Sequence, residues 1–249
     1  MNKNNALVNF TKSDGVIQAI RQELPETYGI AQSALHLLAN SDIDFSKIEP
    51  KSIVRSVVNA VLSGLDPMPL KGECYFIPYK DKLQFQLGWR GLVRLAVDSG
   101  NISRVGVKEV RQGELKAIDE FGEPEVEFSI NNQDKIIGYY AAFETMSGFT
   151  KKMFMSKEDI EKHAKEYSQT YKKGLGVWKD NFDSMAKKTV LKLLLSKFAP
   201  KSQKLSEALR KDQQAHDGTW VDNDAENAPE SPQNTILEES IHEEWSENG

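Results

Sequence analysis

The chain has 249 residues, of which 32 are Lys or Arg and 37 are Asp or Glu, giving a net charge of -5. It has one cysteine, no stretch of 18 consecutive apolar residues, and an N-terminus without the apolar segment of a secretory signal. These features argue against a disulfide-stabilised secreted protein and against a membrane-spanning helix, and they favour a reducing cytoplasm.

The charges are unevenly distributed along the chain. Residues 212–249 contain 11 Asp and Glu and no Lys or Arg, so residues 1–211 hold 26 acidic against 32 basic residues, a net charge of +6. A basic body favours an anionic partner. The polar composition after position 211 is typical of disorder. We therefore predict one domain over residues 1–211, with a helical N-terminal part, and an acidic, disordered tail over residues 212–249.

Within that tail, Leu237, Ile241 and Trp245 recur every four residues. Such a stripe could fold on a partner, or it could dock on the basic body as a phosphate mimic. Our hypothesis is that the tail restrains the body's binding of its anionic partner or recruits a partner protein.

The N-terminal third combines helical periodicity with one hairpin. Apolar spacing predicts helical structure over residues 16–39, interrupted at Pro25. A further helix is expected from an N-cap at Ser52 to a stop at Gly64. Residues 73–79 and 83–87 are typical of two hairpin strands around a short polar turn.

The remaining body alternates between strand and helix signals. A helix over 89–97, closed by Gly100, precedes strand-like segments and later helices. The strand-like segments are 102–111, 115–118, 125–130, 136–145 and 149–155; a capped helix begins at Ser156, a flexible loop spans 168–177, and helices follow over 181–198 and 202–211. This order predicts an α+β fold, an antiparallel sheet with hairpins packed on helices. Cys74 lies in an apolar run and is expected to be a buried structural thiol.

Enzyme motifs are mostly missing from the sequence. It contains no G-x-x-x-x-G-K-[ST] motif, so ATP hydrolysis is not expected. The four histidines (36, 163, 216 and 242) share no metal-ligand spacing. We predict no cofactor and no bond-making catalysis. Two carboxylates brought together by the fold to hold Mg²⁺, as in a nuclease, remain an open alternative.

Positive charge is concentrated in residues 151–211, which hold 16 of the 32 basic residues against 7 acidic ones. Aromatic residues are interleaved with these lysines, a mixture that suits single-stranded nucleic acid because phosphates need cations and unstacked bases need π faces. The spacing places Lys187, Lys188 and Lys192 opposite the apolar stripe of the 181–198 helix. The alternative is an ordinary solvated surface.

A second basic cluster surrounds the hairpin and the helix after it. Arg90 and Arg94 are four residues apart on that helix, and the hairpin turn adds Lys80 next to Tyr79. The alternative is that Trp89 lies in the core and that the arginines pair with local carboxylates.

Several segments, in order and spacing over about residues 25–200, resemble the RecT family of phage and prophage single-strand annealing recombinases. They are Gly64-Leu-Asp-Pro67, Gly72-Glu-Cys-Tyr-Phe-Ile-Pro-Tyr79, Gln86-Leu-Gly-Trp-Arg-Gly-Leu-Val-Arg-Leu-Ala96, Val177-Trp178 and Phe182-Asp-Ser-Met-Ala-Lys-Lys-Thr-Val-Leu191, continuing to Pro200. The first 20 residues and the acidic tail show no such match.

The resemblance implies a protein of phage-type homologous recombination that binds single-stranded DNA and pairs it with a complementary strand without ATP, in the cytoplasm of a bacterial host. It implies a homo-oligomer, either a ring or a helical filament, that also holds the annealed duplex and acts beside a 5′→3′ exonuclease. A Mg²⁺ effect on annealing is left open. A Mg²⁺-dependent nuclease and a duplex-DNA-binding regulator are the alternatives.

Combining the two lines of argument gives a set of expected DNA contacts. Phosphate contacts are expected from cationic side chains, and base or sugar contacts from two aromatic ones. The cationic residues are Lys80, Arg90, Arg94, Lys172, Lys173, Lys187, Lys188 and Lys192, and the aromatic residues are Tyr79 and Trp178.

Overall fold

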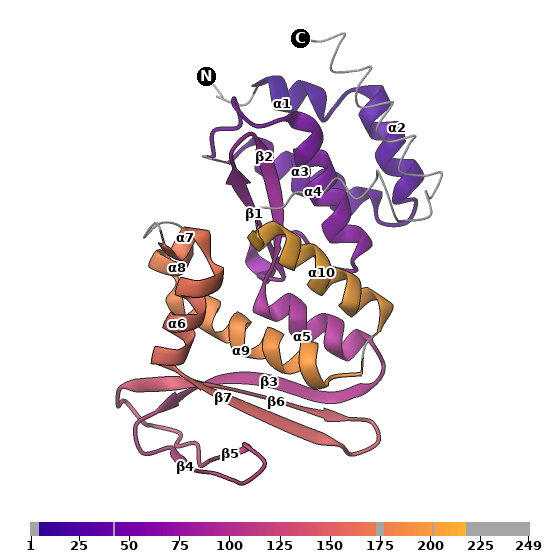
Figure 1. Ribbon diagram of the computed structural model, residues 1–249. Coiled ribbons are helices and arrows are strands. Elements are labelled where there is room, and N and C mark those ends of the chain that lie inside the picture. The colour runs from indigo at the N-terminus through magenta and orange to yellow at the C-terminus, as the bar shows by residue number, and fades with distance from the viewer. Residues whose placement is uncertain (1–4, 42, 173–176, 201, 218–249) are drawn as a thin grey trace. The chain divides into compact units, whose positions relative to one another are not determined.

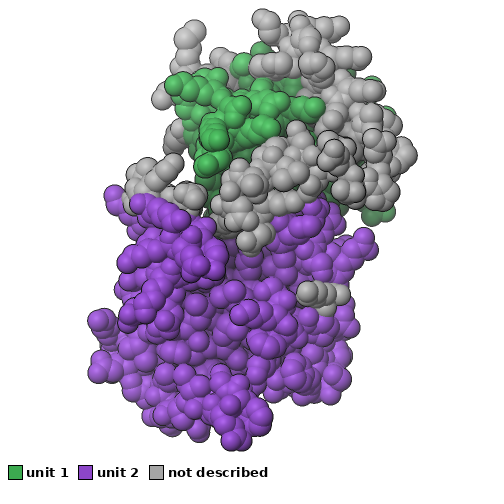
Figure 2. Space-filling view, in the orientation of Figure 1, with its two compact units in different colours: residues 1–86, 220–249 green, residues 87–219 purple. Residues whose placement is uncertain are grey.

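The computed structural model describes residues 5–41, 43–172, 177–200 and 202–217 (Figure 1). The described chain divides into two compact units, with the boundary between Gln86 and Leu87 (Figure 2). The mixture of helices and small antiparallel sheets confirms the predicted α+β class. Each unit is described by itself.

The described part of the first unit is mainly helical. Its helices are α1 (Asn5–Phe10), α2 (Asp14–Glu23), α3 (Tyr28–Ala39), α4 (Pro50–Leu62) and the short 3-10 helix η1 (Pro69–Lys71). Pro25 separates α2 from α3, because proline lacks the N–H that would continue the helical ladder. The apolar faces of the four α-helices meet in one core that includes Phe10, Ile20, Leu35 and Val57.

A β-hairpin, β1 (Cys74–Tyr79) and β2 (Lys82–Leu87), follows these helices. Ser52 was predicted to cap α4, but the helix begins at Pro50, with Glu49 as N-cap residue, and Ser52 lies buried inside it. Its hydroxyl accepts a hydrogen bond from Leu83 N (2.9 Å) and donates one to Glu49 O (2.7 Å). Ser52 therefore ties α4 to the hairpin. Cys74 is buried as predicted, and burial raises the pKa of its thiol to about 12.

The second unit is organised by a three-stranded antiparallel sheet in the order β3 (Ile102–Arg111), β6 (Ile136–Thr145) and β7 (Thr150–Ser156). The register pairs Val107 with Ala141 on β6, which in turn pairs with Met153 on β7. A separate hairpin, β4 (Leu115–Ile118) and β5 (Pro124–Val126), lies in the connection from β3 to β6. The strand predicted over 125–130 is therefore shorter and begins earlier.

Helices cover one face of this sheet (Figure 1). α5 (Trp89–Asp98) packs on β3, α6 (Lys157–Tyr167) on β6 and β7, and α9 (Phe182–Phe198) on all three strands. Alternate β6 residues Tyr139, Ala141 and Phe143 point into this core and are buried, while the β4–β5 hairpin lies on the opposite side of the sheet.

The later helices of the second unit follow the sequence prediction only in part. Ser156 caps α6 as predicted, with its hydroxyl accepting from Asp159 N (3.0 Å). The expected loop 168–177 instead contains α7 (Gln169–Lys172) and, at its end, the start of α8 (Val177–Asp180). The last helix among the described residues, α10 (Gln203–Asp217), continues past position 211, where the charge pattern places the start of the acidic tail. The remaining tail, residues 218–249, lies outside the described residues.

Candidate nucleic-acid interface

Helix α5 presents its two arginines to solvent. Leu92, Leu95 and Ala96 are buried on the inner face, so Arg90 and Arg94, one turn apart, lie on the outer face and are exposed. The Arg90 guanidinium lies over the Trp89 ring, 5.4 Å from its centroid. Arg94 Nε is 3.4 Å from Asp98 Oδ2, and both side chains are about half exposed. A pair this exposed is weak, and 43% of the Arg94 side chain is exposed to solvent.

The hairpin turn of the first unit presents Lys80. Lys80 has a positive φ (55°), unlike the other described residues that are not glycine, because the two-residue turn between β1 and β2 requires it. Its ammonium group lies 5.6 Å from the centroid of the half-buried Tyr79 ring. A cation and an accessible π face are thus adjacent at the tip of one hairpin, the combination that suits a single strand.

Trp178, by contrast, belongs to the core. Only 6% of the residue is exposed, and its ring packs edge-on against Tyr171 (5.4 Å between centroids) and tilted against Phe182 (5.7 Å). Because these rings cover Trp178, a base cannot stack on it in this conformation. Tyr167, one turn after His163 on α6, is the more exposed aromatic side chain of this region.

The basic residues beside Trp178 are placed only in part. Lys172 is exposed on α7. Lys173 lies outside the described residues. Of the two phosphate contacts predicted in this segment, Lys172 is therefore the one that the structure places on the surface.

The three α9 lysines do not form one solvent-facing row. Buried side chains occur on nearly every side of α9, because it is packed against the sheet, α5, α6 and α10. The prediction of a solvent-facing lysine stripe is wrong for Lys188, which is 5% exposed. Burial lowers the pKa of Lys188, while the nearby carboxylate of Asp212 acts in the opposite direction.

Lys188 and Lys192 share one carboxylate. The Asp212 side chain accepts from Lys188 Nζ (2.6 Å) through Oδ1 and from Lys192 Nζ (2.7 Å) through Oδ2. The backbone N–H of Leu87, at the junction of β2 and α5, donates to the same Oδ1 (3.0 Å). Asp212 itself is fully buried.

Sequence reasoning missed Asp212 because its charge grouped it with the acidic residues that follow. The signal was helical periodicity: Leu205, Ala208 and Asp212 are spaced three and four residues apart, and all three are buried. The spacing continues the apolar face of α10 into the supposed tail.

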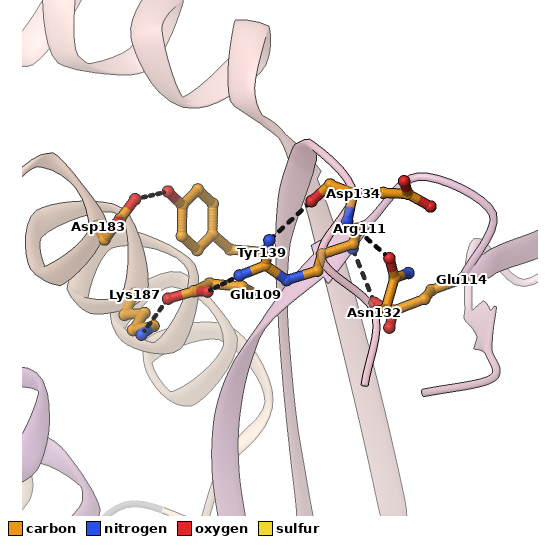
Figure 3. A network of polar contacts seen from close by, with 8 residues as sticks. All are labelled: Glu109, Arg111, Glu114, Asn132, Asp134, Tyr139, Asp183 and Lys187. Carbon is orange, nitrogen blue, oxygen red and sulfur yellow. Dashed lines mark hydrogen bonds and ion pairs between the residues drawn. The ribbon is translucent and has the colours of Figure 1, made fainter. Parts of the chain in front are cut away.

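Lys187 belongs to a different network (Figure 3). Its ammonium group donates to Glu109 Oε1 (2.7 Å), and Glu109 Oε2 also accepts from Arg111 (3.3 Å). Beside them, the Tyr139 hydroxyl donates to Asp183. Burial first, and then this carboxylate, raise the pKa of Tyr139. The network joins the N-terminal half of α9 to β3 and β6.

The same network extends to the loop after β3. Glu114 is almost fully buried, and its carboxylate accepts from Arg111 N (2.8 Å) and Ser129 N (3.1 Å). Burial alone favours the neutral acid. These backbone hydrogen bonds, the Asn132 side chain and the charge of Lys108 together outweigh burial and lower the pKa of Glu114. Glu114 therefore fixes the base of the β4–β5 hairpin.

Neither a metal site nor a membrane-spanning helix is found in the described part of the chain. Among residues 5–217, excluding the gaps, no group of three His, Cys, Asp or Glu lies close enough to hold a metal ion. No helix within the same ranges has the length and apolar character needed to span a membrane.

Comparison with known proteins agrees with the sequence resemblance. A model of the RecT family matches residues 28–231. The chain is 31% identical to the uncharacterized protein YqaK of Bacillus subtilis (strain 168) over 217 residues, covering 87% of this chain and 75% of YqaK. It is 25% identical to Protein RecT of Escherichia coli (strain K12) over 228 residues, covering 85% of this chain and 81% of that protein. The chain therefore belongs to the RecT family of single-strand DNA annealing recombinases.

Proposed function

We propose that this protein binds single-stranded DNA and pairs it with a complementary strand without ATP, within a homo-oligomer. The observation that carries the proposal is the match to the RecT family over most of the chain. The surface chemistry supports it, because Lys80, Arg90, Arg94 and Lys172 are exposed cations and Tyr79 is a partly exposed ring.

Annealing requires no bond to be made or broken. The barrier is the approach of two polyanions with their bases exposed and in register. Cations that neutralise one backbone reduce the repulsion, and bases held away from those cations can then test a second strand. Contacts to phosphates give little sequence preference, because phosphates carry no base identity. Arg90 and Arg94 are our first choice for these contacts, since both lie on the outer face of one helix.

Long strands need more surface than one chain offers, so we propose head-to-tail assembly into a ring or a helical filament. Action beside a 5′→3′ exonuclease belongs to the same proposal. Electron microscopy with and without DNA distinguishes the two assemblies. Particles that stay monomeric under annealing conditions would contradict this part.

The assignment of DNA-binding residues is tested by the salt dependence of binding. Removing one cation that neutralises a phosphate of a single strand should flatten the slope of log K against log salt by about 0.7, so Arg90→Ala combined with Arg94→Ala should flatten it by about 1.4. Arg104→Ala is the matched control. Arg104 is an exposed arginine on β3, its guanidinium 3.7 Å from Glu144, on the sheet face opposite α5. An unchanged slope in the double variant, or an equal change in the control, would show that α5 does not bind the phosphates.

The nuclease alternative is tested in the same samples. Oligonucleotides incubated with the protein and Mg²⁺ should keep their length on a denaturing gel. Shortened products that disappear on replacing a carboxylate would favour bond chemistry instead.

A further inference from the structure

The Asp212 carboxylate accepts hydrogen bonds from three donors that converge from two parts of the second unit. Two are the ammonium groups of Lys188 and Lys192 on α9, at 2.6 and 2.7 Å, and the third is the Leu87 backbone N–H before α5, at 3.0 Å. The site is closed by α10 itself, since Asp212 lies on the buried face of that helix with Leu205 and Ala208.

This donor set is the kind that binds a phosphodiester oxygen. Charge-assisted hydrogen bonds from two ammonium groups, together with one from a backbone N–H, suit the oxygens of a carboxylate and those of a phosphate alike. A buried ammonium group such as that of Lys188 needs an anionic partner, because an unpaired charge in that position is costly. The donor set thus selects for an anion, and α10 supplies one from within the chain.

The position of α10 relates this anion to the proposed DNA surface. α10 packs on α5 and α9. α5 carries the exposed Arg90 and Arg94, and α9 carries the two lysines that hold Asp212. A strand that binds along α5 would therefore lie on a helix that α10 also contacts.

We propose that Asp212 occupies the place of a DNA phosphate, and that α10 is an internal competitor which a bound single strand displaces. On displacement, a phosphate takes the hydrogen bonds of Lys188, Lys192 and Leu87 N, so the buried positive charge stays compensated throughout the exchange. The inference rests on the proposed function and adds its regulation: free protein is held in a weaker-binding state until a strand of sufficient length engages α5.

The alternative is a purely structural ion pair that stays closed when DNA binds. The two cases differ in the behaviour of α10 in the unaltered, full-length protein. Hydrogen exchange of α10 amides, measured with and without a single-stranded oligonucleotide, should become faster on DNA binding if the helix is displaced. Unchanged or slower exchange in α10 would overturn the proposal.

A charge-removing variant gives an independent test. Asp212→Asn weakens the competitor, so single-stranded DNA should bind at least about fivefold more tightly, the lower end of ordinary coupling between two linked sites. Adding Lys192→Ala should remove that gain. Glu207→Gln is the control, since Glu207 is a half-exposed acid on the same helix, paired with Lys211 at 3.2 Å, and it should leave binding unchanged.

The outcomes remain separable from failure of the proposed function. Binding of the oligonucleotide by the unaltered protein is measured first, and its absence would sink the annealing function itself. Equal or weaker binding by a folded Asp212→Asn variant would contradict the competitor role alone. If that variant does not fold, the hydrogen-exchange result on the unaltered chain decides the question.

Discussion

At the scale of single residues, burial decides which charged groups are paired inside the protein and which face solvent. Glu114, Lys188 and Asp212 are charged residues inside the protein, and each has strong donors or acceptors in place. Arg90 and Lys80 are on the surface, and each lies near the ring of an aromatic neighbour. The sequence alone does not distinguish the buried charged residues from the exposed ones, because the identity of a residue does not reveal how deeply its side chain is buried.

Glu114 gives a prediction about pH. Its folded pKa is lowered, so its contribution to stability is full above the unfolded pKa of about 4.3 and is lost as the pH falls through the folded value. Glu114→Gln should lower the free energy of unfolding by about 1–3 kcal/mol at pH 7, because a backbone N–H loses a charged acceptor. The difference from the unaltered protein should shrink as the pH falls below about 4.

Urea unfolding at several pH values measures this effect. Glu125→Gln, an exposed acid on β5, is the control and should change little. A Glu114→Gln deficit that does not depend on pH would mean that packing, and not the carboxylate charge, holds the hairpin base.

At the scale of elements, local signals predicted most of the second unit. The strand-like segments 102–111 and 136–145 predicted β3 and β6, and Ser156 marked the start of α6. The failures came from contacts distant in sequence. Lys188 is buried because Asp212, 24 residues later, supplies its partner, and no periodicity within α9 contains that information.

The sheet makes a prediction through two glycines with opposite surroundings. A Cβ added to Gly138 on β6 would lie 2.4 Å from Met155 O and 2.5 Å from the Phe154 ring. Gly138→Ala should therefore destabilise the protein by about 1–3 kcal/mol, as overpacking does. Gly106→Ala on β3 is the control, since a Cβ there meets nothing within 4 Å. Thermal unfolding of both variants checks this, and equal midpoints would show that the Met155 backbone and the Phe154 ring move away without cost.

α10 makes a prediction about where the chain can be shortened. A protein ending at 217 keeps Asp212, whereas one ending at 211 leaves Lys188 buried without that carboxylate. Removing one partner of a buried ion pair typically costs about 3–5 kcal/mol, so the shorter protein should be the less stable by about that amount. Denaturant unfolding of the two truncated proteins measures it, and equal stability would contradict the anchoring role of Asp212.

At the scale of the whole molecule, charge is separated along the sequence, but the division falls later than the composition suggests. The composition places the boundary between the basic residues 1–211 and the acidic residues after them at position 212. The structure instead places Asp212 inside the basic part, as the partner of two of its lysines. Residue chemistry favoured an anionic partner, and single-stranded nucleic acid in particular. Membership of the RecT family supports the same proposal.

The most direct test of the account is annealing of two complementary oligonucleotides by the full-length protein, with no ATP present. The account predicts that duplex forms faster than in a protein-free reaction, at a rate that falls as salt is raised and that drops when Arg90 and Arg94 are both changed to Ala. A rate no faster than the protein-free reaction, under conditions where the protein binds each single strand, would contradict it.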